Sequence, residues 1–255
     1  MRFRDKVVWI TGASSGIGEA TAVAFSREGA KLILSSRNAA ELERVRQACE
    51  GDGHRVVPLD LTHPDSFPAA VAEVGHVDIL VHSGGVSQRS LAADTDLATD
   101  HAIMDLNFFG TVALTKAVLP SMLARKSGHI VPISSVVGYV GTPLRSTYAA
   151  SKHALHGFFD SLRAEVAKNG IAITIVCPGY IRTNVSRNAL TGNGSTFGQM
   201  DGTHERAMRP EECARRIVNA VADRKQEVVI GGLETWAVPL KRFFPRLVSR
   251  MVRMK

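Results

Sequence analysis

The sequence predicts an α/β protein: a Rossmann-type doubly wound parallel sheet of about seven strands, with helices on both faces, folded as a single domain. Three observations predict it. Short β-rich runs alternate with helix-period segments along the whole chain. The β-rich runs are nearly continuous in apolar residues, which is typical of parallel strands that are covered on both faces. No repeat of solenoid period and no low-complexity linker interrupts the 255 residues.

The predicted strands and helices alternate in chain order. Strands are expected at Val7–Thr11, Lys31–Ser35, Arg55–Leu59, Val77–His82, Gly128–Ser134, Ile171–Cys177 and Glu227–Ile230. Amphipathic stretches predict helices at Gly18–Glu28, Ala40–Cys49, Asp65–Val74 and Tyr148–Lys168. We expect a dinucleotide-binding catalytic domain at residues 1–235 and a basic amphipathic tail at residues 236–255.

The turn after the first strand predicts a dinucleotide site. It reads Thr11-Gly12-Ala13-Ser14-Ser15-Gly16-Ile17-Gly18. Glycines permit a tight turn, and they let backbone N–H groups approach a pyrophosphate at the start of the next helix. The spacing alone also occurs in plain strand–helix turns, but its place after the first strand favours the cofactor. The candidate residues are Gly12, Ser14, Ser15, Gly16, Ile17 and Gly18.

The end of the second strand favours NADP(H) over NAD. An acidic side chain there would bind the ribose hydroxyls of NAD and would repel a 2′-phosphate. This chain has Ser36 and Arg37 instead. A guanidinium group can bind a phosphate through charge-assisted hydrogen bonds, although a single arginine can equally be a solvated surface residue.

Tyr148 and Lys152 lie four residues apart and share one face of a predicted helix. A free tyrosine has a pKa near ~10, but a neighbouring ammonium group and a positively charged nicotinamide would lower it. The pair can then transfer a proton to or from a substrate oxygen. Ser135 follows a strand and can donate a hydrogen bond to that oxygen, whereas Ser134 should point to the other face.

In their order and spacing these motifs resemble the short-chain dehydrogenase/reductase family over nearly the whole chain. The residues that carry the resemblance are the glycine turn, Asn107, Ser135, Tyr148-x3-Lys152 and Pro178-Gly179. The resemblance implies that Asn107 holds a water that connects Lys152 to solvent, and that Asp60 contacts the adenine. It also implies cofactor contacts by Leu61, His82, Gly84, Tyr148, Lys152, Pro178, Gly179, Ile181 and Thr183.

One segment departs from the family pattern. Asn-Asn-Ala-Gly usually follows the fourth strand, and here the positions read His82-Ser83-Gly84-Gly85. The larger His82 and the backbone freedom of Gly84 are expected to affect local stability and cofactor affinity. The segments Tyr148–Phe159 and Cys177–Asn184 further resemble the dehydrogenase/reductase member-seven branch, which implies lipid-like carbonyl substrates and an association with membranes.

The substrate is predicted to be a medium-sized apolar carbonyl compound or secondary alcohol, because no fixed charge stands out near the reaction centre. Some of the candidate pocket residues can equally be core residues. They are Val86, Val137, Tyr139, Leu144 and Tyr180, with Leu190, Phe197 and Met200 from a polar insertion at about 186–209. The glycine-bearing composition of this insertion predicts a mobile lid.

The net charge of +7 is concentrated in the tail, because six basic residues and no acidic residue follow Glu234. The rest of the chain is close to neutral, so no nucleic-acid groove is expected. The apolar residues Phe243, Phe244, Leu247, Val248, Met251 and Val252 could form one stripe. Such a helix can lie on an anionic membrane, or it can pack on a partner subunit or on the body of the protein.

Cys49, Cys177 and Cys213 are widely spaced, and we interpret them as reduced thiols in apolar surroundings. No metal-ligand spacing is present, so no metal site is expected. No apolar run approaches ~20 residues, and a cytoplasmic location is expected. The resemblance implies a homodimer or homotetramer. The alternative function is a non-catalytic NADP(H)-binding sensor or structural protein on the same fold.

Overall fold

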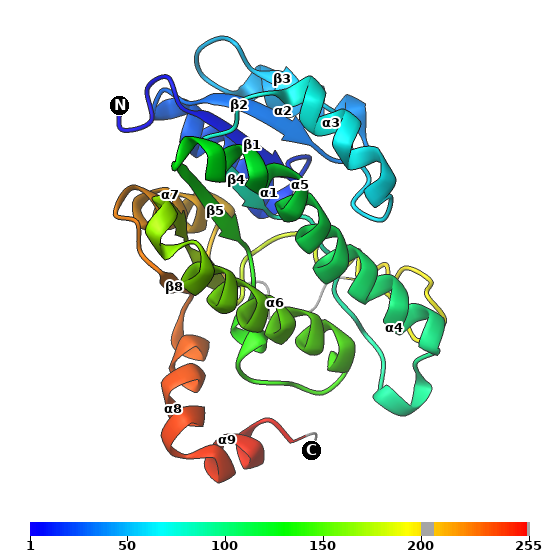
Figure 1. Cartoon of the computed structure of the whole chain (residues 1–255). Helices are drawn as coiled ribbons and strands as arrows, with labels where there is room; N and C mark the ends of the chain where they lie inside the picture. The colour runs from blue at the N-terminus through cyan, green and yellow to red at the C-terminus, as the bar shows by residue number, and fades with distance from the viewer. Residues whose placement is uncertain (200–206, 254–255) are drawn as a thin grey trace.

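The computed structural model describes residues 1–199 and 207–253 and has a central six-stranded parallel sheet (Figure 1). Its order is β3-β2-β1-β4-β5-β6. The strands are β1 (Val7–Thr11), β2 (Lys31–Ser35), β3 (Arg55–Val56), β4 (Ile79–His82), β5 (Gly128–Pro132) and β6 (Ile171–Ile173). The predicted parallel sheet is confirmed. The order reverses between β1 and β4, where open α/β sheets bind ligands beyond the carboxyl ends of their strands.

The sixth predicted strand, Ile171–Cys177, is divided into β6 and β7 (Ile175–Pro178) at Thr174. The backbone N–H of Thr174 still donates to Ile130 O, but its hydroxyl donates to Lys225 O and pairs with His129 Nε2. After this residue the chain pairs with β8 (Glu227–Ile230) in a separate two-stranded ladder. Ser134 N donates to Val176 O, so the smaller sheet continues along the edge of the larger one.

Helices cover both faces of the sheet because alternate strand residues point to opposite sides. On one face, α1 (Gly16–Arg27), α2 (Ala39–Ala48) and α7 (Pro210–Ala222) bury a core that includes Ile10. On the other face, α3 (Phe67–Val74), α5 (Gly110–Arg125) and α6 (Ser146–Glu165) bury a core that includes Trp9. The doubly wound prediction is confirmed. Short 3-10 turns lie at Pro64–Ser66, Ala92–Asp94, Val136–Gly138, Ala167–Asn169 and Leu233–Trp236.

A long helical run begins with α4 (Leu97–Met104), passes through a π-helical turn at Asp105–Phe109 and continues as α5. An 18-residue window within Leu97–Arg125 has a mean hydropathy of 1.4, so by length and composition this run could cross a membrane. The sequence patterns above did not predict such a run. Leu114, Val118 and Met122 of α5 are buried against the sheet, but only 39% of the window is buried, so core packing accounts for part of its apolar composition.

The C-terminal tail consists of α8 (Ala237–Phe243) and α9 (Pro245–Met251), which lie below the sheet in Figure 1. The expected continuous stripe is broken because Pro245 cannot extend the preceding helix. Val248 is only 3% exposed, and Lys241 Nζ donates to Tyr139 O. The tail therefore packs on the body of the protein, which was one of the two predicted arrangements.

The described part of the polar insertion is held by hydrogen bonds to its surroundings. Leu190 N donates to Ser87 O at 2.9 Å, and Leu190 O accepts from Arg89 N at 2.8 Å. Gly192 O accepts from Asp96 N at 2.9 Å and from Thr99 Oγ1 at 3.0 Å. Residues 200–206, including Met200, lie outside the described residues, and the mobile lid stays a prediction.

Candidate active site

A cavity of about 970 Å³ lies at the carboxyl ends of β1, β4 and β5. It brings most of the predicted cofactor and catalytic residues together. The predicted site residues in its lining are Gly12, Ser14, Ser15, Gly16, Ile17, Ser36, Arg37, Asp60, Leu61, Gly84, Ser135, Tyr148, Lys152, Pro178, Gly179, Ile181 and Thr183. Gly18, His82 and Asn107 are not in the lining. They support it from behind.

The glycine turn is packed too closely for other residues. Gly12 and Gly16 have φ values of 64° and 59°, a region that favours glycine. A Cβ atom on Gly12 would lie 2.6 Å from Gly84 N, and one on Gly18 would lie 2.2 Å from Gly12 O. Gly18 thus fixes the turn against the start of α1 and is not among the residues that line the cavity, and its direct contact with the cofactor stays a prediction.

The departure at His82–Gly85 has a packing explanation. A Cβ atom on Gly84 would lie 2.5 Å from Leu61 Cδ1, so glycine leaves room for the Leu61 side chain. Gly84 does not have a positive φ, so its backbone conformation does not require glycine as expected. This position requires glycine because a larger residue would collide with Leu61. The His82 side chain points away from the cavity, and its Nε2 atom pairs with Thr115 Oγ1 at 2.8 Å. The His82 side chain therefore supports the cavity from behind, and a direct contact with the cofactor stays a prediction.

His82 and His129 are both buried histidines with low pKa values. Burial lowers the pKa of His82 to about 3. Burial, with the charge of Arg224, lowers that of His129 to about 4. A ring that stays neutral in the folded protein is protonated in the unfolded chain below about pH 6.5. Their contribution to stability is therefore complete above pH 6.5 and is lost as the pH falls towards 4 and then 3.

We expect His82→Asn to reduce the acid sensitivity of folding. Between pH 7 and pH 5, protonation of the unfolded His82 ring should lower the free energy of unfolding by about 2 kcal/mol. The asparagine variant should lose about that much less than the wild-type protein, as measured by urea unfolding at both pH values. His101→Asn, at an exposed position, serves as the control. Equal losses in the wild type and the His82 variant would contradict the expectation.

The end of the cavity where the adenosine of the cofactor is predicted to bind contains Ser36, Arg37 and Asp60. Arg37 is exposed to the solvent in the cavity. Although burial raises the pKa of Asp60, hydrogen bonds from Thr62 and the charge of Arg37 lower it overall. The Asp60 carboxylate accepts hydrogen bonds from Thr62 N at 2.9 Å and from Thr62 Oγ1 at 2.8 Å. These two bonds fix the carboxylate on the loop that carries it.

Tyr148 lies near the N-terminus of α6, where Gln88 Oε1 accepts from the backbone N–H groups of Thr147 and Tyr148. Burial raises the pKa of Tyr148, and a hydrogen bond with Ser135 and the charges of Arg145 and Arg89 lower it less. The lowered pKa of Tyr148 predicted from the sequence included the charge of a nicotinamide ring. In the protein by itself the Tyr148 hydroxyl is a protonated acid at neutral pH.

Lys152 is 5% exposed, and its Nζ atom lies 5.7 Å from the centre of the Tyr148 ring. The ammonium group donates to Ile133 O at 2.9 Å. Burial lowers the pKa of Lys152 to about 8. The predicted Tyr148–Lys152 pair is confirmed as a contact of the ammonium group with the aromatic ring.

Ser135 and Ser134 point to different sides, as predicted. Ser135 Oγ donates to Pro178 O at 3.2 Å and lines the cavity next to Tyr148. Ser134 Oγ donates to Lys152 O at 3.1 Å and pairs with His156 Nε2 at 2.9 Å. Ser134 therefore attaches α6 to the end of β5, while Ser135 lies at the cavity, where a bound oxygen would replace Pro178 O as the acceptor of its hydrogen bond.

Asn107 is fully buried in the π-helical turn. Its Oδ1 atom accepts from Val86 N at 2.8 Å, and its Nδ2 atom donates to Val86 O and to Ser151 Oγ. These bonds connect α6 to the loop after β4. A Cβ atom on Gly85 would lie 3.0 Å from Asn107 Oδ1 and 3.5 Å from Lys152 Nζ, so Asn107 lies beside the lysine. The water-holding role stays a prediction.

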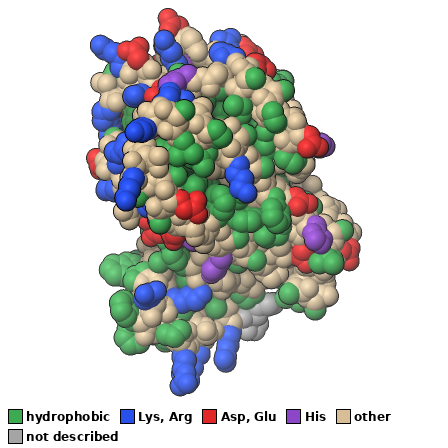
Figure 2. All heavy atoms as spheres, in the orientation of Figure 1, with side chains coloured by type: hydrophobic (Ala, Val, Ile, Leu, Met, Phe, Trp, Pro, Cys, Tyr) green, Lys and Arg blue, Asp and Glu red, His purple; other side chains and the backbone are tan. Residues whose placement is uncertain are grey.

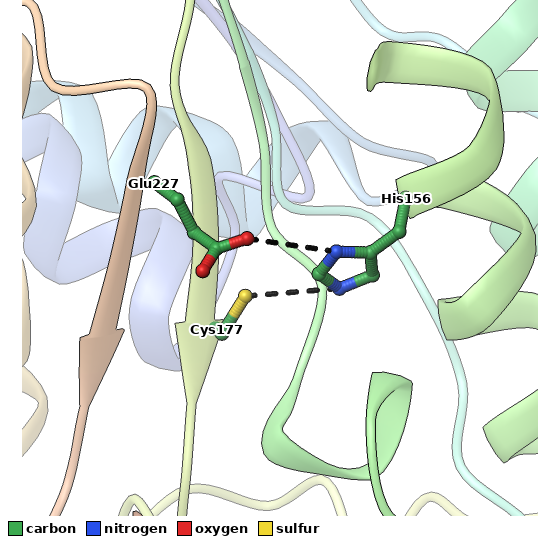
Figure 3. Close-up of side chains that lie close together, drawn as sticks. All are labelled: His156, Cys177 and Glu227. Carbon is green, nitrogen blue, oxygen red and sulfur yellow. Dashed lines mark hydrogen bonds and ion pairs between the residues drawn. The ribbon is translucent and has the colours of Figure 1, made fainter. Parts of the chain in front are cut away.

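Where α6 packs against β7 and β8, His156, Cys177 and Glu227 lie together (Figure 3). Their ligand-type atoms lie within 4.8 Å of one another, a grouping that the spacing did not predict and that could hold a metal ion. His156 Nδ1 faces Glu227 Oε2 at 3.8 Å, whereas Nε2 faces Cys177 Sγ at 3.8 Å and Ser134. The two ring nitrogens thus face different partners, and burial raises the pKa of Cys177 to about 12. This arrangement suits a hydrogen-bonded link that fixes α6 on β7.

Four of the predicted substrate residues line the cavity: Val86, Val137, Tyr180 and Leu190. Tyr139, Leu144 and Phe197 do not. The Tyr139 ring packs on His156 with 4.4 Å between the ring centres, and Leu144 is 38% exposed.

Several residues of the cavity lining were not predicted from the sequence, and four of them bear on the substrate. Ala237 and Val252 of the tail line the cavity although they lie 89 and 104 residues beyond Tyr148 in the chain. Arg89 and Arg145 also line it, so the expectation that no fixed charge lies near the reaction centre is wrong. No short motif marks these four positions, because folding alone brings them to the cavity.

The three cysteines are free thiols, as expected. Cys177 and Cys213 are fully buried and Cys49 is half-buried.

Comparisons with known proteins agree with this geometry. The family model for short chain dehydrogenases matches residues 6–193. "Dehydrogenase/reductase SDR family member 7B" of Rattus norvegicus is 43% identical over 262 residues, covering 98% of this chain and 81% of the relative. "Dehydrogenase/reductase SDR family protein 7-like" of Anopheles gambiae is 48% identical over 236 residues, covering 88% and 74%.

Two solved structures share the fold. A short-chain dehydrogenase from Streptomyces avermitilis has a TM-score of 0.78 and 28% identity, covering 98% of this chain and 100% of that chain. The closed form of a serine dehydrogenase complexed with NADP+ has a TM-score of 0.80 and 24% identity, covering 89% and 95%.

Proposed function

Because the chain belongs to the short chain dehydrogenase family, we propose that it is an oxidoreductase that transfers a hydride between NADP(H) and a carbonyl compound or secondary alcohol. The observation that carries the proposal is the convergence of Ser135, Tyr148 and Lys152 on one wall of the cavity whose other end is the glycine turn. A solved relative of the same fold is described as complexed with NADP+, which is consistent with this cofactor.

The residues present fit a dinucleotide. The glycine turn lines the cavity in a backbone conformation that favours glycine, and this supports pyrophosphate binding by Gly12–Ile17. Ser36 and Arg37 would bind the 2′-phosphate, and Pro178–Thr183 would hold the nicotinamide end. When bound, NADPH supplies the hydride that adds to the carbonyl carbon.

In the proposed reduction, Tyr148 Oη donates its proton to the carbonyl oxygen as negative charge develops there. Its raised pKa favours the protonated form that this step needs. Ser135 Oγ donates a hydrogen bond to the same oxygen. The Lys152 ammonium group stabilises the phenolate that remains. Oxidation of the alcohol reverses each proton movement.

The apolar lining supports a substrate with an apolar body beside Val137, Leu190 and Val252. Arg89 and Arg145 add positive charge near Tyr148. We test this by NADPH oxidation across a panel of apolar carbonyl compounds, in matched pairs with and without an anionic group. A clear preference for small sugars or small acids would overturn the apolar substrate. Turnover of no carbonyl, with NADPH still bound, would favour the sensor alternative.

We also propose a homodimer or homotetramer formed through α5 and α6. Phe109 is 55% exposed in the π-helical turn directly before α5 and packs edge-to-face on Phe108, which in turn contacts Phe158 of α6. Phe109→Glu should lower the mass measured by light scattering to that of a monomer, because a charge would be buried in the contact. Leu91→Glu, at another exposed position, should leave the mass unchanged. A monomeric wild-type protein would contradict the proposal.

The reduced thiols and the family's fold are consistent with a cytoplasmic location, which we propose together with a peripheral membrane contact.

A further inference from the structure

Large exposed apolar side chains are concentrated near the C-terminus. Six of the thirteen such residues in the described chain lie within residues 233–251. We name this group the tail surface: Leu233, Trp236, Phe243, Phe244, Leu247 and Met251. Their exposure ranges from 47% for Leu247 to 87% for Leu233. A soluble protein rarely places so many large apolar side chains together on its surface unless something covers them.

The tail surface is combined with positive charge. Arg242, Arg246, Arg250 and Arg253 are exposed on the same two helices and the residues after them. No acidic residue follows Glu234. Figure 2 shows apolar and basic side chains gathered over the part of the molecule where Figure 1 places α8 and α9.

The tail is fixed to the body of the protein beside the cavity. Glu234 Oε1 accepts from Tyr180 N at 2.9 Å and from Gly232 N at 3.0 Å. Val248 is buried, while Ala237 and Val252 line the cavity. The inner side of the tail therefore belongs to the cavity wall, and its outer side carries the tail surface.

We propose that the tail surface docks the protein on an anionic lipid bilayer. Short amphipathic helices with apolar and basic side chains bind in the interfacial region of such membranes. Bulky side chains such as Trp236 and Phe243 supply apolar area, and the arginines are attracted to anionic headgroups. The cavity wall lies directly behind the docked helices, so docking places the substrate cavity at the membrane.

The charge distribution favours lipid over a second copy of the chain. A symmetric contact would bring the same surface of two copies together. Each copy would then place its arginines against those of the other, and no acidic residue of the tail could pair with them. Anionic lipid supplies the complementary charge.

The fluorescence of Trp236 tests the proposal directly. The chain has two tryptophans, and Trp9 is fully buried whereas Trp236 is 71% exposed. With vesicles of phosphatidylcholine and phosphatidylserine we expect a blue shift in emission and quenching by brominated acyl chains. Vesicles of phosphatidylcholine alone should give much weaker binding. The assay contains neither NADPH nor substrate, so its failure is distinct from a failure of the proposed catalysis.

Two pairs of variants assign the binding to the tail surface. Arg246→Gln with Arg250→Gln should weaken vesicle binding about fivefold per residue. The control pair Lys168→Gln with Arg215→Gln, exposed elsewhere, should leave binding unchanged. Phe243→Ser with Phe244→Ser should also weaken it at least about tenfold, unlike Leu91→Ser with Leu97→Ser. NADPH binding and thermal unfolding verify the fold of each variant.

Three results would overturn the proposal. The first is no shift and no co-sedimentation with anionic vesicles. The second is equal weakening by the tail pairs and the control pairs, which would indicate a non-specific charge effect. The third is a lower solution mass of the Phe243/Phe244 variant in the absence of lipid, which would assign the surface to a second copy of the chain.

Discussion

Tyr148→Phe is expected to lower the turnover number for carbonyl reduction by about 10³-fold, the range in which general acid catalysis contributes. The substitution removes the proton that Tyr148 would donate but retains the ring. Lys152 Nζ lies 5.7 Å from the centre of that ring, so the lysine keeps its aromatic neighbour. NADPH affinity, measured by titration calorimetry, should change by only a few-fold.

The chain has only three tyrosines, so the other two give matched controls. Tyr139 is outside the cavity lining, and its hydroxyl faces Cys177 Sγ at 3.8 Å. Tyr180 lines the cavity at 37% exposure. Tyr139→Phe and Tyr180→Phe should retain most of the turnover. If Tyr148→Phe also does so, the assigned mechanism is wrong. If that variant loses NADPH binding as well, its lower turnover does not report on proton transfer.

Arg37→Asp is expected to reverse the cofactor preference. The wild-type protein should use NADPH with a higher kcat/KM than NADH. Losing a charge-assisted hydrogen bond to the 2′-phosphate and placing a carboxylate there should lower kcat/KM for NADPH by about 100-fold or more. The carboxylate can accept hydrogen bonds from the ribose hydroxyls of NADH, so activity with NADH should be retained or raised.

Arg215→Asp introduces the same change of charge at an exposed position of α7, outside the cavity lining, and should leave the ratio of the two kcat/KM values unaltered. An unaltered ratio in Arg37→Asp would mean that Arg37 does not bind the 2′-phosphate. A wild-type preference for NADH would refute the choice of cofactor without affecting the role of Tyr148.

The sequence by itself determined the sheet and most of the predicted site residues that line the cavity, Tyr148 among them. β1 and β2 have the bounds that their apolar runs predicted, because strands buried on both faces leave continuous apolar segments. The glycine turn could be predicted because its conformation requires a residue without a side chain. Ser135 could be predicted because it follows the end of a strand. Tyr148 and Lys152 could be predicted because their four-residue spacing places them on one face of a helix.

The tertiary structure decided what depends on contacts between distant segments. Only packing against Leu61 explains Gly84, and only the hydrogen bond to Thr115 turns His82 away from the cavity. Burial, which no motif encodes, raises the pKa of Tyr148 where a lowered value was expected. Arg89 lies in a loop and Val252 in the folded tail, and both line the cavity. Neither could be predicted, because the residues around them in space are remote in the chain. Local pattern therefore specified the chemistry, and long-range packing specified its surroundings.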